Sequence, residues 1–264
     1  KGGITDATAI CAGGDFTCVL RQGGGASCWG DNLSGQLGTP GSNGSAVPVT
    51  VQNVSDLVGI SCGELHACAV ASTGKVYCWG ENSHGELGNG GTSGSIPTPS
   101  QLVTIDSVFS MAAGRRSTCA LKKNGDVFCW GANDLGQLGS GSASSAPNPT
   151  PTQVPGLKAS ALWAGDDHAC AVKSGGVGIV CWGSGYYGQL GDNVVRDDAS
   201  TPQATPVSVN GVNRMAIGIG TGGNHSCAPL ETGAILCWGA NDHGQIGNGT
   251  TDPALTPDSV MGYP

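Results

Sequence analysis

A three-residue phrase, Cys-Trp-Gly, returns five times along the 264 residues of this chain. The copies lie at residues 28–30, 78–80, 129–131, 181–183 and 237–239. A second phrase, in which Gln or Glu and then Leu or Ile stand between two glycines, follows each copy at residues 35–38, 85–88, 136–139, 188–191 and 244–247. Motifs that return at nearly regular intervals indicate that each repeat is one supersecondary unit, which buries its apolar face by stacking on its neighbours.

Each Cys-Trp-Gly phrase also follows an alternating stretch that carries a cysteine of its own. These earlier cysteines are Cys18, Cys68, Cys119, Cys170 and Cys227. They are 50, 51, 51 and 57 residues apart, and if the ends of the chain were joined, the step from Cys227 round to Cys18 would be 55 residues. Five whole repeats therefore fill the chain, which favours a closed ring over an open solenoid with polar caps.

The composition of the repeats favours short strands joined by turns. Glycine is abundant, with 47 residues, and only 11% of the residues are charged, which is typical of all-β folds with many tight turns. We predict an all-β fold, a closed β-propeller of five four-stranded blades that occupies residues 1–264 as a single domain. Residues 256–260 resemble residues 205–209, and residues 4–7 resemble residues 54–57, so we expect strands from both termini to close the last blade.

The twelve cysteines indicate disulfides rather than a zinc site, because no Cys-x-x-Cys spacing occurs in the chain. In each repeat two cysteines stand ten or eleven residues apart around a turn, so they should face each other on adjacent strands. The expected hairpin bridges are Cys18–Cys28, Cys68–Cys78, Cys119–Cys129, Cys170–Cys181 and Cys227–Cys237. We expect Cys11 and Cys62 to join the first two repeats; the alternatives are two free thiols or a link to a partner. Disulfides imply an oxidising compartment, so we expect the chain to be secreted, extracellular or on the cell surface.

The charge of the chain excludes one large class of partner. The formal net charge is −8, from 11 basic and 19 acidic residues, whereas nucleic-acid binding needs a basic face that neutralises phosphates. We therefore predict no nucleic-acid partner. No segment approaches the roughly 18 apolar residues that a membrane helix needs, so we predict no membrane insertion either.

The Trp-Gly and Gly-Gln-Leu-Gly phrases, five times in register, resemble the repeats of the regulator of chromosome condensation family. The resemblance implies a β-propeller with four-stranded blades. Well-known members of that family usually have seven repeats, so five repeats leave two possibilities, a tighter five-bladed ring or part of a longer chain. The even spacing around the joined ends favours the ring.

The resemblance also implies a binding site at the mouth of the central channel. In the family, contacts often come from residues that follow a glycine at the end of the inner strand. The corresponding residues here are Asp15, Glu64, Leu65, Arg115, Arg116, Asp166, Asp167 and Asn224. They place acids on the first, second and fourth repeats and two arginines on the third, which fits a polar protein surface or a glycan.

Three histidines, His66, His168 and His225, come directly after these residues and would converge on the channel. A metal could be held by such a group, but the repeat explains the imidazoles as hydrogen-bond partners of a neighbouring strand, and we predict neither a metal nor another cofactor. Asp166, Asp167, His168 and Ser226 include the residue types of a catalytic triad, but no strained nucleophile turn accompanies them. We therefore predict that the chain is not an enzyme.

We predict a non-enzymatic extracellular module that binds a protein through the channel mouth. The alternatives are a structural subunit that self-assembles into a surface assembly or filament, and a carbohydrate-binding lectin. Tyr186 and Tyr187 are candidates for an interface, or they pack under the long loop that follows them. The glycosylation sequons are Asn43, Asn248, Asn32, Asn53 and Asn224; the first two lie in Gly- and Ser-rich loops and are the better acceptors.

Overall fold

The computed structural model describes residues 3–196 and 201–262, which form strands, turns and loops. In these residues no helix could span a membrane. The strands are β1 (Ala7–Ala12), β2 (Phe16–Arg21), β3 (Ala26–Gly30), β4 (Ser45–Thr50), β5 (Leu57–Cys62), β6 (His66–Ala71), β7 (Val76–Glu81), β8 (Ser95–Leu102), β9 (Val108–Ala113), β10 (Ser117–Lys122), β11 (Asp126–Asn133), β12 (Ser144–Ala164), β13 (His168–Lys173), β14 (Ile179–Gly183), β15 (Gln203–Ser208), β16 (Gly220–Thr221), β17 (His225–Pro229), β18 (Ile235–Gly239) and β19 (Ala254–Ser259).

Antiparallel pairing groups these strands into four sheets. β1–β4, β5–β8 and β16–β19 are separate four-stranded sheets, each in chain order. β9 to β15 form one seven-stranded sheet because β12 is shared: residues 144–158 pair with β11, and residues 159–164 pair with β13. We call the successive sets of four strands units 1 to 5 and count β12 in both unit 3 and unit 4.

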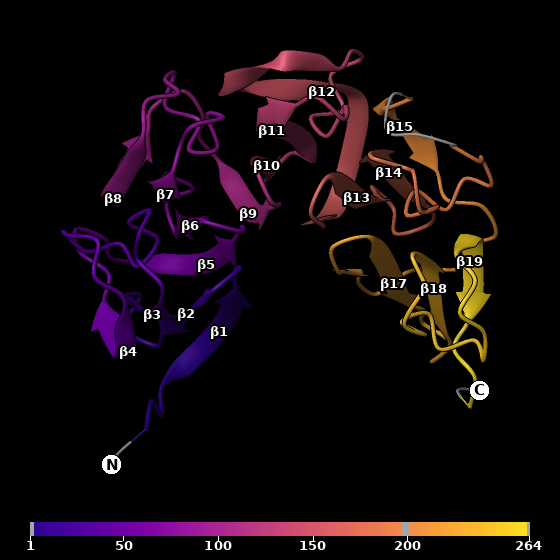
Figure 1. Cartoon of the computed structure of the whole chain (residues 1–264), viewed down its shortest axis with the longest axis horizontal. Coiled ribbons are helices and arrows are strands. Elements are labelled where there is room, and N and C mark those ends of the chain that lie inside the picture. The colour runs from indigo at the N-terminus through magenta and orange to yellow at the C-terminus, as the bar shows by residue number, and fades with distance from the viewer. Residues whose placement is uncertain (1–2, 197–200, 263–264) are drawn as a thin grey trace.

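The units follow one another along an arc (Figure 1). The first strand of each unit lies on the inner side of this arc, and residues of β1, β5, β9 and β12 line one cavity there. The outermost strands, β4, β8, β15 and β19, lie on the outer side in Figure 1. This arrangement is that of propeller blades, with each inner strand beside the central channel.

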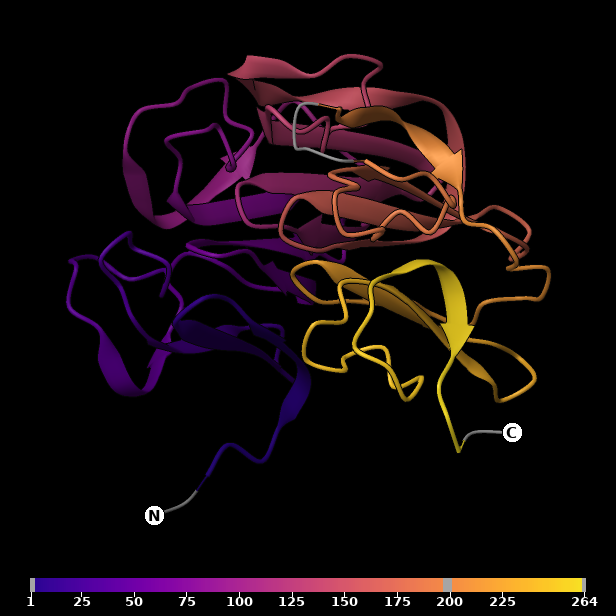
Figure 2. The same ribbon diagram turned by 45° about the vertical axis from the view of Figure 1, so that its right-hand side comes forward.

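The two ends of the arc do not meet. Unit 1 and unit 5 lie on opposite sides of an opening in both ribbon views (Figures 1 and 2). β1 pairs with β2 inside unit 1, and β19 pairs with β18 inside unit 5, so the expectation that both termini complete the last blade is wrong. The physical reason is that one continuous repeat supplies all four strands of each end unit, and both terminal strands already have a partner there.

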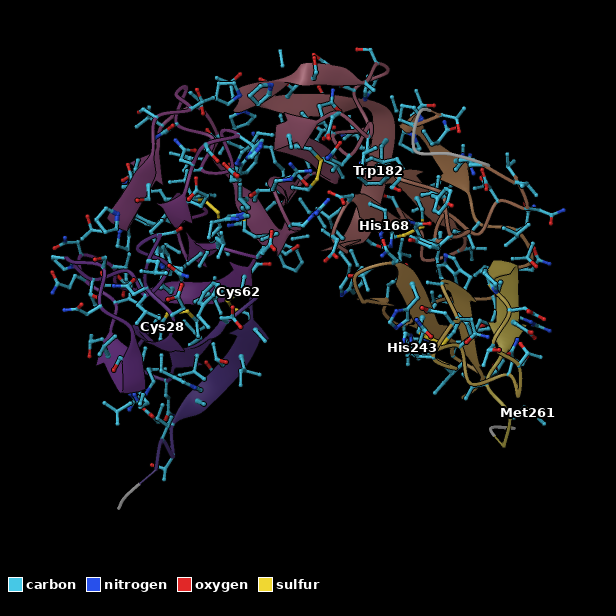
Figure 3. All side chains as sticks on the ribbon, in the orientation of Figure 1. Cys28, Cys62, His168, Trp182, His243 and Met261 are labelled. Atoms are coloured by element: carbon cyan, nitrogen blue, oxygen red, sulfur yellow. A yellow bond between two sulfur atoms is a disulfide. The ribbon has the colours of Figure 1, made fainter. Side chains whose placement is uncertain are left out.

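The predicted hairpin bridges are all present. In unit 2, Cys68 and Cys78 are direct cross-strand partners of β6 and β7, with Cα atoms 4.1 Å apart. This separation is typical of the closer type of antiparallel pair, the one without hydrogen bonds between the two residues. Gly74 adopts a φ of 81° in the connecting turn, which a glycine reaches without steric cost. The other units have the same bridge within their own hairpins, visible as yellow bonds in Figure 3.

The sixth disulfide joins two units. Cys11 of β1 is bonded to Cys62 of β5, with Cα atoms 5.5 Å apart. Of the three possibilities for these cysteines, the structure therefore has the bridge between the first two repeats. All twelve cysteines of the chain are paired.

Each junction between neighbouring units has a hydrophobic cluster of its own. At the junction of units 1 and 2, Leu20 and Leu37 of unit 1 pack in one cluster with Leu57 and Trp79 of unit 2. Similar clusters fill the junctions of units 2 and 3, 3 and 4, and 4 and 5. The core of the molecule is therefore divided among four inter-unit layers, as expected of a repeat protein.

Candidate functional site

The predicted channel mouth is built from five short turns, each between the first and second strands of a unit. Each turn starts with a glycine at the end of the inner strand: Gly13, Gly63, Gly114, Gly165 and Gly222. A Cβ atom at Gly13 would lie 2.5 Å from the carbonyl oxygen of Gly63 in the next unit. Glycine is required here because the neighbouring backbone approaches too closely for a side chain.

Backbone hydrogen bonds connect several of these turns. The amide of Gly14 donates to the carbonyl of Glu64 at 3.0 Å, and that of Arg115 donates to the carbonyl of Asp166 at 2.9 Å. The amide of Asp166 donates in turn to the carbonyl of Gly223 at 3.1 Å. The mouth is thus a rim whose backbone is held between units, so its side chains project from a fixed frame.

The five turns line one pocket of about 320 Å³. Its charged side chains are Glu64, Arg115 and Asp166, and the same position is a glycine in units 1 and 5, Gly14 and Gly223. The second residues of the predicted pairs are outside this lining: Asp15, Leu65, Arg116, Asp167 and Asn224. The structure therefore divides the eight predicted residues into an inner set, which faces the pocket, and an outer set behind it.

Charges at the mouth are unequally compensated. Arg115 forms an ion pair with Asp167, and Arg116 lies 3.7 Å from Asp134. Asp15, Glu64 and Asp166 make no salt bridge within the described part of the chain. Both arginines are thus already engaged, and the exposed field of the mouth is acidic.

Burial and ion pairing compete at Arg115 and Asp167. Burial raises the pKa of Asp167 above its ordinary value, although Arg115 and Arg116 act to lower it. Burial lowers the pKa of Arg115, but its attraction to the carboxylates of Asp167, Asp166 and Glu64 prevails and raises it. Burial thus prevails at Asp167 and ion pairing at Arg115, because the Asp167 side chain is only 10% exposed, whereas that of Arg115 is 36% exposed and keeps more of its hydration.

The residue types of a catalytic triad do not form one. His168 Nε2 lies 2.8 Å from Ser226 Oγ, but Ser226 is fully buried and His168 Nδ1 has no hydrogen-bond partner among residues 3–196 and 201–262. The imidazole therefore lacks the orienting carboxylate that a triad needs. His66 makes the same contact with Thr118 Oγ1 at 2.8 Å, so this pair is a repeated contact between units.

Beneath the mouth lies a second cavity of about 590 Å³, formed by the inner strands. Its lining includes Ile60, Phe109 and Trp163, and Phe109 is 60% exposed. None of these three was among our predicted binding residues. Their signal in the sequence is weak, because an apolar residue on an inner strand looks the same whether it faces the channel or the neighbouring unit.

The other predicted sites are outside the lining of the mouth pocket. Tyr186 and Tyr187 form an edge-to-face pair with ring centroids 4.8 Å apart, and they are 46% and 41% exposed. Among the sequons, Asn43 and Asn53 are exposed. Asn32 is buried and its amide bonds Gly41 and Leu37, while Asn248 donates to Asp258; Asn224 is half-buried in the fifth mouth turn.

Comparison with known proteins gives a consistent result. Residues 2–263 match the family model described as the RCC1-like domain. The ultraviolet-B receptor UVR8 of Arabidopsis thaliana is 31% identical over 159 residues, which are 59% of this chain and 35% of that protein. The secretion-regulating guanine nucleotide exchange factor of Mus musculus is 28% identical over 280 residues, which cover 97% of this chain and 60% of that protein. The chain thus spans less than two thirds of the length of these relatives.

Solved structures share the fold. Yeast RCC1 (Prp20), in its structure bound to Kap60, superimposes with a TM-score of 0.83 at 21% identity, over 96% of this chain and 61% of that chain. The CRINKLY WD40 ectodomain of the Arabidopsis thaliana receptor kinase ACR4 gives a TM-score of 0.54 at 21% identity, over 96% of this chain and 66% of that chain. At this level of identity the likeness establishes the fold alone.

Proposed function

The chain belongs to the family of RCC1-like domains, and from this premise we propose that it is a non-catalytic module that binds a protein partner through the channel mouth. The observation that carries the proposal is one pocket lined by turns from all five units, on whose wall Glu64 and Asp166 make no salt bridge within the described residues. Sites of this kind commonly lie on loops that a rigid scaffold holds in place. We further propose that residues 1–264 act as one propeller domain.

The partner that best fits this mouth presents a basic surface. In the part of the chain that the structure describes, three carboxylates there make no salt bridge, and both arginines are engaged by carboxylates of the chain itself. Complementary charge steers association and excludes partners of the same sign. Among related structures, yeast RCC1 is bound to the protein Kap60, which supports a protein rather than a small molecule as the ligand.

We propose that this module works outside the cell or on its surface. Six disulfides within 264 residues are typical of an oxidising compartment. The propeller of the receptor kinase ACR4 is an ectodomain, which supports the same location. The argument from the disulfides would fail if the chain, isolated from its native source with thiols blocked, carried free cysteines.

The test of the binding proposal compares two double variants as immobilised bait, in the disulfide-intact chain. Glu64→Lys with Asp166→Lys reverses two carboxylates of the pocket, and Glu231→Lys with Asp106→Lys makes the same change of charge in exposed loops that connect other strands. Captured proteins from the native extracellular surroundings are quantified by mass spectrometry. We expect the pocket variant to lose a basic partner at least tenfold, while the control retains it.

The binding proposal is refuted if both variants retain the same partner as the unchanged chain. Thermal midpoints of the two variants, compared with that of the parent, establish that the pocket variant is folded. Asp167 is left unchanged, because its reversal would break a buried ion pair with Arg115 and confuse folding with binding.

One observation favours a second candidate, self-association. Tyr186 and Tyr187 expose two aromatic rings next to each other on the surface of unit 4, and exposed tyrosines often anchor interfaces. Light scattering of the purified chain should then report oligomers that Tyr186→Ser with Tyr187→Ser dissolves. A chain that stays monomeric at high concentration rules this candidate out.

A further inference from the structure

The disulfide between Cys11 and Cys62 differs from the five hairpin bridges in the elements that it joins. Each hairpin bridge lies inside one sheet, between the second and third strands of a unit. Cys11 and Cys62 belong to β1 and β5, which are in separate sheets. This disulfide is therefore a covalent link between the inner strands of two units, and neither hairpin depends on it.

Both residues of this disulfide can be reached from solvent. Cys11 and Cys62 are half-buried, whereas nine of the ten hairpin cysteines are at most 2% exposed. The tenth, Cys227, is half-buried, but its partner Cys237 is only 2% exposed. Cys11 and Cys62 line the cavity of about 590 Å³ beneath the mouth, and Cys62 also lines the mouth pocket. A small molecule that enters through the mouth therefore meets Cys62 first.

The repeat indicates that the junction of units 1 and 2 does not need a covalent bond. The equivalent pair at the junction of units 2 and 3 is Ser61 and Ala113, which stand at the same register positions opposite the second strands. There the Ala113 amide donates to Ser61 Oγ at 2.9 Å. Opening the disulfide thus leaves a junction of a kind that the molecule already contains, with the buried cluster around Trp79 still in place.

We propose that the Cys11–Cys62 disulfide is a site of thiol–disulfide exchange for small thiols of neutral or positive charge. A thiolate attacks Cys62 Sγ and forms a mixed disulfide with it, the bond between the two cysteine sulfurs breaks, and Cys11 Sγ leaves. A second thiolate attacks the sulfur of the bound reagent and releases Cys62. Each cysteine takes up the proton that one attacking thiol gave up, so two thiols are oxidised to one disulfide while the bridge is reduced. The rate of such exchange depends on access to the attacked sulfur.

The charge of the mouth selects among the thiols that can enter. Glu64 lies two residues after Cys62, and Glu64 and Asp166 line the mouth pocket without a salt bridge in the described residues. Arg115 is in the same lining but pairs with Asp167. A cleft of negative potential concentrates cations and depletes anions, so it disfavours anionic thiols. Salt screens exposed charges, so this preference weakens as the ionic strength rises.

Exchange at this site loosens one sector of the rim. When the disulfide is open, the hydrogen bond from the Gly14 amide to the Glu64 carbonyl, 3.0 Å long, still joins the first two mouth turns. The covalent restraint two residues before Glu64 is lost, so this turn opens more often. The third and fourth turns keep their bond from the Arg115 amide to the Asp166 carbonyl. The mouth thus has a rigid oxidised form and a looser reduced form.

The first measurement identifies the disulfide that reacts. The native chain is incubated with cysteamine for increasing times, the reaction is quenched in acid, free thiols are alkylated, and non-reducing peptide mapping locates each sulfur. We expect cysteamine on Cys62 and an alkylated Cys11 at a rate at least tenfold above that of any hairpin bridge. Opening of Cys227–Cys237 at the same rate, attachment of cysteamine to Cys11 instead of Cys62, or resistance of all six bridges until the chain unfolds would each overturn the proposal.

The matched control is Cys11→Ser with Cys62→Ala, because it copies the Ser61 and Ala113 pair of the next junction. This variant should lack the fast reaction, and its hairpin bridges should open as slowly as those of the parent chain. Fast exchange that persists in the variant would place the reactive disulfide in a hairpin and refute the assignment.

The second measurement tests the role of charge with two thiols, cysteamine, which carries an ammonium group, and 3-mercaptopropionate, which carries a carboxylate. Both are used at equal thiolate concentration, and each rate is divided by that of the same thiol with a neutral small-molecule disulfide. We expect the normalised rate of cysteamine to be about fivefold higher at low salt. The ratio should approach one in about 1 M salt and in Glu64→Gln with Asp166→Asn. Equal normalised rates at low salt would refute selection by the acidic mouth.

Hydrogen exchange of the mouth amides is the third measurement. The Gly14 amide should exchange faster once the Cys11–Cys62 disulfide is open, while the Arg115 amide keeps its rate. An unchanged rate for the Gly14 amide would show that the disulfide does not restrain the rim.

Discussion

Two fully buried imidazoles make the stability of this protein depend on pH in a calculable way. His66 and His168 are enclosed between units, and burial lowers the pKa of each from 6.5 to about 4. In the unfolded chain these groups bind a proton near pH 6.5, but in the folded chain they do so only near pH 4. Because the folded pKa is the lower one, the stability linked to each histidine is fully present above pH 6.5. This stability is lost as the pH falls from about 6.5 towards 4.

The test replaces the contact between His66 and Thr118 by a pair of residues that the molecule already has at the equivalent place of another junction. The double variant His66→Phe with Thr118→Ala copies the Phe16 and Ala67 pair of the preceding junction. Glu86 keeps one hydrogen bond to its carbonyl, from Trp130. We expect the variant to stay within about 1 kcal/mol of the parent at pH 7, because such a swap keeps the volume roughly constant.

The magnitude follows from the pKa values. Between pH 7 and pH 5, one histidine with pKa values of about 4 folded and 6.5 unfolded loses about 2 kcal/mol of folding free energy. The parent chain has two such groups, and the variant has one. Urea unfolding at pH 7, 6 and 5 should therefore show a pH-dependent loss that is smaller in the variant by about 2 kcal/mol.

The control for this experiment is His243→Phe, because the side chain of His243 is 84% exposed. This variant should lose as much stability between pH 7 and pH 5 as the parent chain. If His66→Phe with Thr118→Ala also loses as much as the parent, the imidazole of His66 is not held neutral between the units, and the reasoning is refuted.

Three further changes test the frame of the molecule. Gly63→Ala should lower the free energy of unfolding by more than about 1 kcal/mol, because its Cβ would collide with the Gly114 carbonyl; thermal unfolding that matches the parent would contradict the close approach of units 2 and 3. Removing the disulfide of unit 3 by Cys119→Ala with Cys129→Ala should lower the free energy of unfolding, measured in urea, by about 2–3 kcal/mol. An unchanged midpoint would mean that the disulfide does not stabilise this hairpin. Arg196→Met should lower the free energy of unfolding by about 3 kcal/mol, because it leaves the Asp192 carboxylate without its partner while that side chain is only 9% exposed. Denaturation at several salt concentrations measures this loss. An unchanged free energy of unfolding would show that the ion pair adds nothing to stability.

The sequence predicts local structure well here because the same motifs and spacings recur in five repeats. The cysteine spacing predicts every hairpin bridge, and the pairing of Cys68 with Cys78 is what symmetry about a tight turn requires. The position of the mouth turns also follows from the repeat, since one glycine marks each of them. What the repeat cannot predict is which residue of each charged pair faces the pocket, because that depends on how neighbouring turns bond each other.

Two departures from the repeat needed the structure. Gly185 stands where the other units have an asparagine, and the Arg196 side chain lies so close that a Cβ at Gly185 would be 2.7 Å from its Cδ. The arginine belongs to the variable loop that follows the Gly-Gln-Leu-Gly phrase and bonds Asp192 there, so the spacing of motifs does not indicate that its side chain takes the place of an asparagine. The opening between units 1 and 5 is equally hidden, because the spacing of the repeats favours a closed ring.

The shared strand β12 has a consequence for how this chain unfolds. Elsewhere a loop separates the last strand of one unit from the first strand of the next, but residues 144–164 continue as one strand from the edge of unit 3 into unit 4. In a repeat protein, cooperativity depends on the coupling between nearest neighbours, and here the coupling includes the backbone ladder itself. Units 3 and 4 should therefore open together as one block in hydrogen exchange, while the units at the two ends exchange first.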